Sequence, residues 1–174
     1  MKRSVPILLI LAVLFLCSCF DERNQMATNR WGGSSDVLMG EIIEIIEKKD
    51  CAELRALFSG QALSEAEFLD DGMAYLFMLF DGNVVSFEQR SLPSSVRTRT
   101  SGRLTFEKSD STYIVTTEND VYLFAFSVYF IDDEKPENIG IYRIAAIRAD
   151  DEEILYPWRN WEIPGIYIPD KTAE

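Results

Sequence analysis

The side chains best suited to acid–base chemistry in this 174-residue chain are two adjacent carboxylates, Asp70 and Asp71. Tyr75 follows Asp71 by four residues, so on a helix these two side chains share a face. A carboxylate in a dry cavity has a raised pKa and can act as a base, as an isomerase requires. The alternative, which we favour, is a solvated helix face. The possible pocket is predicted to comprise Asp70, Asp71, Tyr75, Tyr122, Phe124, Trp158 and Trp161.

The chain contains no histidine, which removes Ser-His-Asp and Cys-His catalysis and histidine-bound metals. It has three cysteines, and Cys51 is the one that stands alone in the middle of the chain. A helix N-terminus can lower the pKa of a thiol. However, the spacing from Cys51 to Leu54 and Phe58 predicts a shared buried face, so we expect an inert core cysteine. No catalytic residue, metal site or cofactor is predicted.

Arg97, Arg99 and Arg103 form a basic cluster in a chain of net charge −12. Arginines bind carboxylates and phosphates through two parallel hydrogen bonds, so the cluster is a possible contact for an anionic ligand or partner. The alternative, which we favour, is local balance of the many surface carboxylates. The overall acidity argues against a nucleic-acid partner, whose binding requires neutralisation of phosphates.

The N-terminal residues resemble a secretory signal with a lipid-attachment motif. Lys2 and Arg3 precede an apolar run from 5 to 17, which is shorter than a membrane-spanning helix. The motif Leu16-Cys17-Ser18-Cys19 is similar to the bacterial lipobox, which implies that Cys19 receives the lipid. We therefore expect anchoring in the cell membrane, facing outside the cytoplasm.

The chain divides into a signal peptide, a tether and one domain. Residues 1–18 form the signal peptide, residues 19–35 the lipidated cysteine and a polar Gly/Ser-rich tether, and residues 36–169 the domain. Periodicity predicts helices over about 36–49, 50–58 and 64–80. Asp36, Asp50 and Ser64 are the expected N-caps, the last two with a glutamate three residues later.

The second half of the domain has the two-residue period of strands. Strands are predicted over 84–89, 103–108, 113–117, 121–131 and 140–149, with a polar connection over 92–102. Both faces of the 121–131 strand are apolar, so the face away from the helices is expected either to be covered or to form a binding surface. A C-terminal aromatic strap from about 156 is the candidate cover, which either completes the core, as we favour, or acts as a lid. The fold class is α+β, with three N-terminal helices packed on a curved antiparallel sheet.

Several segments together resemble a family of Gram-positive bacterial lipoproteins to which no activity is assigned. They are ALFS at 56–59, MAYLFMLFDGNVVSFE at 73–88, YIVTTENDVYLFAFSVYFID at 113–132, IGIYRIAAIR at 139–148 and WEIPGIYIP at 161–169. The resemblance covers residues 36–169 and implies the cone fold of nuclear transport factor 2, which is cystatin-like. It implies no catalytic residue.

Three function classes follow from these observations. The leading expectation is a non-enzymatic, membrane-anchored domain that binds a small apolar ligand or a protein partner. The alternatives are a small hydrolase or isomerase with a cavity carboxylate, and a structural envelope protein that forms a homodimer through its sheet. An enzyme needs a buried carboxylate beside a tyrosine or asparagine, whereas a dimerising protein needs an exposed apolar sheet face.

Overall fold

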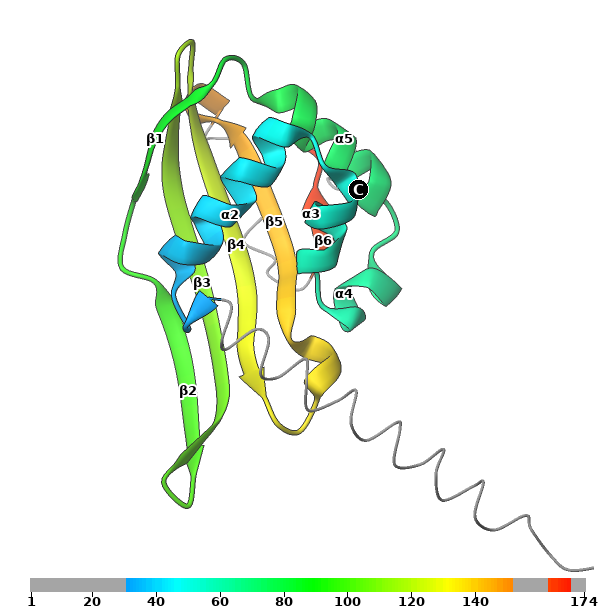
Figure 1. The fold of residues 1–174 in the computed structure, drawn as a ribbon, viewed down its shortest axis with the longest axis vertical. Helices are drawn as coiled ribbons and strands as arrows, with labels where there is room; N and C mark the ends of the chain where they lie inside the picture. The colour runs from blue at the N-terminus through cyan, green and yellow to red at the C-terminus, as the bar shows by residue number, and fades with distance from the viewer. Residues whose placement is uncertain (1–30, 152–162, 170–174) are drawn as a thin grey trace, which may run out of the picture.

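Four helices precede a six-stranded mixed sheet in the computed structural model, which describes residues 31–151 and 163–169 (Figure 1). The predicted α+β class is confirmed, whereas the predicted number of three helices is wrong. The helices are α2 (Ser35–Lys48), α3 (Cys51–Leu57), α4 (Gly60–Glu65) and α5 (Leu69–Leu79). The strands are β1 (Val84–Gln89), β2 (Ser94–Thr100), β3 (Arg103–Thr117), β4 (Val121–Asp132), β5 (Gly140–Arg148) and β6 (Gly165–Tyr167), with a 3-10 turn, η1 (Pro136–Asn138), before β5.

Side chains at the helix starts explain where α2 and α3 begin. Asp50 caps α3 as predicted, and its Oδ1 accepts hydrogen bonds from the backbone N–H groups of Ala52 and Glu53 at 3.0 and 2.9 Å. The cap predicted for α2 is wrong, because Ser34 rather than Asp36 accepts from the N–H of Val37. The Asp36 carboxylate instead accepts a hydrogen bond from the hydroxyl of Tyr113 on β3.

The start predicted for the helix over 64–80 is wrong, because α5 begins at Leu69, and residues 64 and 65 belong to a separate helix, α4, that begins at Gly60. Ser59 caps α4, with its Oγ 3.0 Å from the N–H of Ala62, and its own N–H donates to the carbonyl of Ile141 on β5. Ser64 lies inside α4 and donates to the carbonyl of Gln61, so it caps nothing. The contact with β5 fixes the start of α4 earlier than local sequence suggests, and α5 begins separately at Leu69.

The sheet has the order β1-β3-β4-β5-β6, and β2 also pairs with β3. Strand β1 lies along the end of β3 near Thr117, whereas β2 lies along the half of β3 from Arg103 to Asp110. All pairs are antiparallel except β5 with β6, so the predicted purely antiparallel sheet is wrong.

Two predictions about the middle of the chain are also wrong, because pairing keeps polar residues extended. Residues 92–102 include the strand β2, and the two strands predicted over 103–108 and 113–117 are one continuous strand, β3. Lys108 and Asp110 stay in the strand because β4 pairs with β3 on one side and β2 on the other. Cross-strand pairing thus overrides the weak strand preference of these residues.

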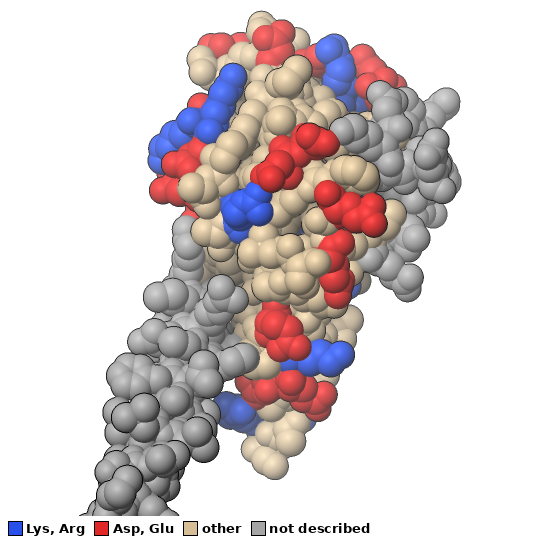
Figure 2. Space-filling model, turned by 90° about the vertical axis from the view of Figure 1, so that its right-hand side faces the viewer, with Lys and Arg blue, Asp and Glu red and all other residues tan. Residues whose placement is uncertain are grey.

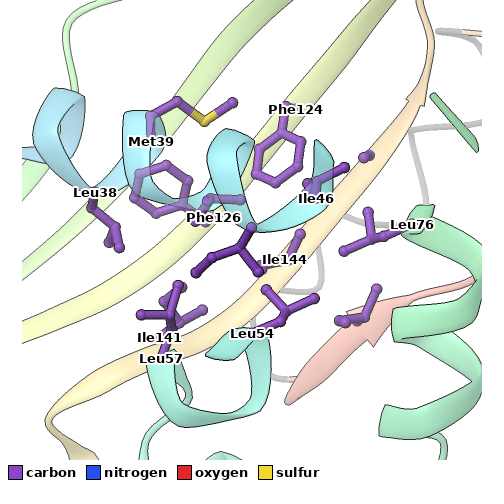
Figure 3. Close-up of a cluster of buried hydrophobic side chains, with 14 of the residues drawn as sticks. Leu38, Met39, Ile46, Leu54, Leu57, Leu76, Phe124, Phe126, Ile141 and Ile144 are labelled. Carbon is purple, nitrogen blue, oxygen red and sulfur yellow. The ribbon is translucent and has the colours of Figure 1, made fainter. Parts of the chain in front are cut away.

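The main core lies between the helices and one face of the sheet (Figure 3). The alternation predicted for β4 is confirmed on this face, where Phe124 and Phe126 are fully buried against Leu38 and Met39 of α2. Leu54 of α3 and Leu76 of α5 complete the layer above β5. Burial of these large apolar side chains supplies the main driving force for folding.

The C-terminal part of the domain joins the sheet. Ile166 of β6 faces the main core, and α5 crosses it so closely that a Cβ on Gly72 would lie 2.5 Å from the Cβ of Ile166. On the other face of the sheet, Leu123 and Ile147 form a second small buried cluster. Residues 156–162 of the predicted strap lie outside the described residues. No helix in the described part of the chain is long and apolar enough to cross a membrane.

Candidate partner-binding surface

The predicted carboxylate pair lies on the surface of the helical layer. Asp70 and Asp71 are exposed in the first turn of α5, and Asp70 forms an ion pair with Arg55 of α3. They line an open hollow of about 300 Å³ together with Leu63 and Phe68. Figure 2, which views the side of the helical layer, shows acidic side chains distributed among uncharged ones. A solvated helix face is therefore the arrangement at Asp70 and Asp71.

Tyr75, Tyr122 and Phe124, the other described residues of the predicted pocket, do not line this hollow. Tyr75 is partly buried, and its hydroxyl donates to the carbonyl of Ala146 on β5 at 2.9 Å. Tyr122 and Phe124 are fully buried, and the Tyr122 hydroxyl accepts a hydrogen bond from the N–H of Asp81. The ring of Phe80 packs 4.6 Å from that of Tyr122, so side chains fill this part of the interior. Trp158 and Trp161 lie outside the described residues.

The prediction that Cys51 is buried is wrong, because its side chain is exposed at the first position of α3. The buried face of this seven-residue helix is formed by Leu54 and Leu57. Cys51, Ala52 and Glu53 are all exposed, so the first turn of α3 lies in solvent. A helical wheel could not predict the exposure of Cys51, because it shows the face on which a residue lies and not its distance from the end of a short helix.

The most distinctive exposed feature is the hairpin formed by β2 and the facing half of β3, residues 94–110, which we call the arm. From Phe106 on, β3 is also paired with β4 on its other side. It extends beyond the helical layer at the lower end of the sheet (Figure 1). Every residue of β2 is exposed. Among the described residues, β2 pairs only with β3, so its outer edge has no neighbouring strand there. Residues 94–100 lack the hydrophobic alternation by which a strand is usually recognised.

The three predicted arginines all belong to this arm, but each has a neighbour of its own. Arg97 lies opposite Glu107 in the strand register and forms an ion pair with it at 2.6 Å. Arg103 pairs with Asp133, whereas Arg99 donates to the carbonyl of Gly102 at 3.2 Å. The structure therefore gathers the three residues on one arm without converging them on one anion. Arg97 still exposes 61% of its side chain, so a partner can reach it.

A network of hydroxyl groups joins the base of the arm to the start of α2. Ser111 donates to Ser35 at 2.8 Å, and Ser109 lies 3.3 Å from both Ser35 and Ser95. Ser35, Ser109 and Ser111 are buried. Since Ser35 opens α2, the arm is held directly to the point where the N-terminal segment enters the domain.

Tyr113 extends this network on the same face of β3. Its hydroxyl donates to Asp36 at 2.7 Å. Burial, and then the hydrogen bond and charge of Asp36, raise the pKa of Tyr113 far above its ordinary value of 10. The phenol therefore stays protonated and acts as a structural donor between β3 and α2.

Comparison with known protein families gives a match that covers most of the helical layer and the arm. A family model described as "Domain of unknown function (DUF5104)" matches residues 41–149. The chain belongs to the DUF5104 family. The match begins inside α2 and ends just after β5, so the DUF5104 region includes the whole arm, the second part of α2 and all of α3, α4 and α5. No curated protein is significantly similar to this chain.

Proposed function

We propose that this DUF5104 protein is a lipid-anchored, extracytoplasmic binding domain that takes up a protein partner along the outer edge of β2. The observation that carries the proposal is the seven-residue strand β2, exposed throughout and paired on one side by β3. An exposed strand edge presents unpaired N–H and C=O groups, which a partner strand can satisfy.

The arm is built firmly enough to act as a preformed template. Strand β3 supports β2 over its full length, and β4 supports β3 in turn. The serine network then fixes the base of the arm to α2. A rigid edge loses little conformational entropy on binding, which favours affinity.

We further propose that the fold is the cone of the nuclear transport factor 2 type. The helices on one face of the sheet and the long β3, β4 and β5 strands support this assignment. Cones of this type hold ligands between helices and sheet in some members. Here Tyr113, Tyr122, Phe124 and Phe126 pack tightly at that level, with the rings of Tyr113 and Phe126 stacked 5.8 Å apart. This packing favours a partner on the strand edge over a small apolar ligand inside.

Lipid attachment at Cys19 would hold the domain at the outer face of the cell membrane, so the partner would bind there. The start of α2, which follows the predicted tether, lies next to the base of the arm. Metabolic labelling with a fatty-acid analogue is expected to tag the wild-type protein and the Cys51→Ala variant, but not Cys19→Ala. Persistence of the tag in Cys19→Ala would contradict the anchor assignment.

The edge itself is tested by photo-crosslinking in intact cells, with a photoreactive residue at Val96 on β2. Val96 is 56% exposed, and Met78 on α5, which is 83% exposed, is the matched control position. We expect a discrete adduct from Val96 that is absent from Met78. The same adducts from both positions, or none from Val96, would contradict the proposal.

Proline variants show whether the adduct depends on strand pairing. Neighbouring positions of an edge strand direct their N–H groups alternately toward β3 and outward, so Ser95 and Thr98 point theirs in opposite directions. We expect one of Ser95→Pro and Thr98→Pro to retain the unfolding midpoint and lose the Val96 adduct. Retention of the adduct in the variant that stays folded would contradict strand addition.

A further inference from the structure

We infer that the segment added to β2 is an extended acidic peptide strand of a partner protein, with carboxylates at alternate positions facing Arg97 and Arg99. This inference rests on the proposed function and identifies the partner's chemistry. Side chains of a strand alternate between faces, so Arg97 and Arg99 share one face and Val96 and Thr98 the other. A pairing strand places its own residues directly opposite, about 5 Å away.

The local charge around β2 differs in sign from that of the chain. Arg90, Arg97, Arg99 and Arg103 fall within residues 90–106, which contain no aspartate or glutamate, although the chain has a net charge of −12. Glu107 balances part of the charge of Arg97 from the β3 side. Arg99 donates to a backbone carbonyl and has no ion pair among the described residues. Its charge is thus available to a carboxylate on the incoming strand.

A second copy of this chain fits the edge less well. Antiparallel pairing of β2 with itself over its full length, Ser94 to Thr100, would set Arg97 against the Arg97 of the other copy. Like charges directly opposite one another destabilise a strand pair. It would also place Ser95 opposite Arg99, which gives no charge compensation. The same edge paired with an acidic strand places a carboxylate opposite each arginine.

An anionic membrane surface also fits less well than an acidic strand. An anionic membrane would be repelled by the net negative charge of the whole domain. A bound strand, in contrast, lies within a few ångströms of the arginines and is affected mainly by their charge. Charges beyond about 8 Å are largely screened at physiological ionic strength. The unpaired backbone groups of β2 add hydrogen bonds that only a peptide strand can complete.

The test measures binding of fluorescent eight-residue peptides to the full mature protein by anisotropy. The first peptide alternates Glu and Val, the second alternates Lys and Val, and the third is the Glu peptide with two central prolines. We expect the Glu–Val peptide to bind at least tenfold more tightly than either of the others. Raised salt is expected to weaken its binding.

The charge contribution is isolated by the double variant Arg97→Gln/Arg99→Glu. Its matched control is Arg55→Gln/Lys48→Glu, which changes the net charge equally at exposed sites on α3 and α2. We expect about tenfold weaker or weaker binding of the Glu–Val peptide in the arm variant and unchanged binding in the control. Unfolding midpoints of both variants establish that the fold is retained. The single variant Arg99→Glu serves if the double variant does not fold.

The possible failures have different meanings. Equal binding of the Lys–Val peptide, or no binding of any peptide, overturns the acidic strand, whereas the Val96 adduct independently decides whether the edge binds a partner. Equal binding of the proline-containing peptide overturns strand addition in favour of simple charge attraction. Binding to phosphatidylglycerol vesicles that is lost in Arg99→Glu, without peptide binding, would assign the arm to the membrane. A dimer that dissociates in the folded proline variant would assign it to a second copy.

Discussion

Tyr113 is a residue whose protonation is coupled to the stability of the domain. It is buried, and burial together with Asp36 raises its pKa above the ordinary value of 10. An acid whose pKa is raised in the folded state contributes stability that is complete below the unfolded pKa. That contribution is lost as the pH rises above about 10. Tyr129 behaves in the same direction, because burial and then the charges of Asp110 and Asp132 raise its pKa.

Replacing Tyr113 with Phe should therefore lower the stability at neutral pH and also reduce the further loss of stability at alkaline pH. At pH 7 we expect a loss of about 1 kcal/mol, because the hydrogen bond to Asp36 is removed. Above pH 10 the variant should lose stability less steeply than the wild type, with Tyr129 accounting for part of the remaining loss. Urea unfolding at pH 7 and pH 11 measures both effects. Equal losses in the two proteins between these pH values would contradict this explanation.

Cys51 is the second residue whose environment leads to a prediction. Its exposed thiol should react with an aromatic disulfide reagent in the native protein at nearly the rate seen in urea. If Cys19 is lipidated and Cys17 leaves with the signal, the mature protein should titrate as one thiol, and Cys51→Ser should titrate as none. A thiol that reacts about a hundredfold more slowly in the native protein than in urea would indicate that Cys51 is buried in the core.

At the scale of elements, the short helices depend on how their ends are capped and where they touch the sheet. Helix α4 has six residues, too few to be stable in isolation. It forms because Ser59 caps it while bonding to Ile141 of β5. Helix α5 starts without a side-chain cap but packs Gly72 against β6. Tertiary contacts therefore fix both helices in place.

Serine substitutions separate the true cap of α4 from the predicted one. Ser59→Ala is expected to cost about 1 kcal/mol or slightly more, because the N–H of Ala62 loses its acceptor in a buried site. Ser64→Ala should change stability by less than about 0.5 kcal/mol, since Ser64 is exposed and caps nothing. Thermal unfolding of the two variants makes the comparison. A larger loss for Ser64→Ala would support the original prediction of a cap there.

A pair of helical glycines tests the packing of α5 on β6. Gly72→Ala should destabilise the protein by about 1–3 kcal/mol, because its Cβ would collide with Ile166. Gly40→Ala in α2 is the control, because its nearest neighbour would be the Phe87 ring at 3.8 Å. Alanine should stabilise α2 there by up to about 1 kcal/mol. Similar effects at both positions in chemical denaturation would contradict the close α5–β6 contact.

For the molecule as a whole, β6 determines whether the C-terminal segment is part of the fold or an accessory to it. Ile166, Tyr167 and Ile168 are buried, and β6 pairs with β5 along the edge of the sheet. Truncation after Asp150 removes this strand, and it exposes Ile144, which lies opposite Ile166, and the surface of α5 around Gly72. We therefore expect the chain truncated after Asp150 to lose the cooperative thermal transition that the full-length chain shows. A truncated protein with a native-like transition would instead support a lid.

The amount of the structure that could be predicted varies with how strongly local sequence constrains each element. The Asp50 cap, the long strand β4 and the α+β order follow from local capping groups and apolar periodicity, and all three are confirmed. Strand β2 could not be predicted, because Ser94–Thr100 has no apolar alternation and is extended only because β3 lies beside it. The two parts predicted for β3 merge for the same reason.

The candidate site shows the same division. The sequence alone determined that Arg97, Arg99 and Arg103 are clustered and that the chain has no histidine with which to build common catalytic centres. Only the tertiary structure decided that Asp70 and Asp71 face solvent and that Arg97 and Arg99 lie on a strand whose outer edge has no partner strand among the described residues. Composition and spacing act within a few residues, whereas exposure and strand pairing depend on segments distant in the chain. The surface proposed to bind a partner is therefore a property of the sheet and not of any one motif.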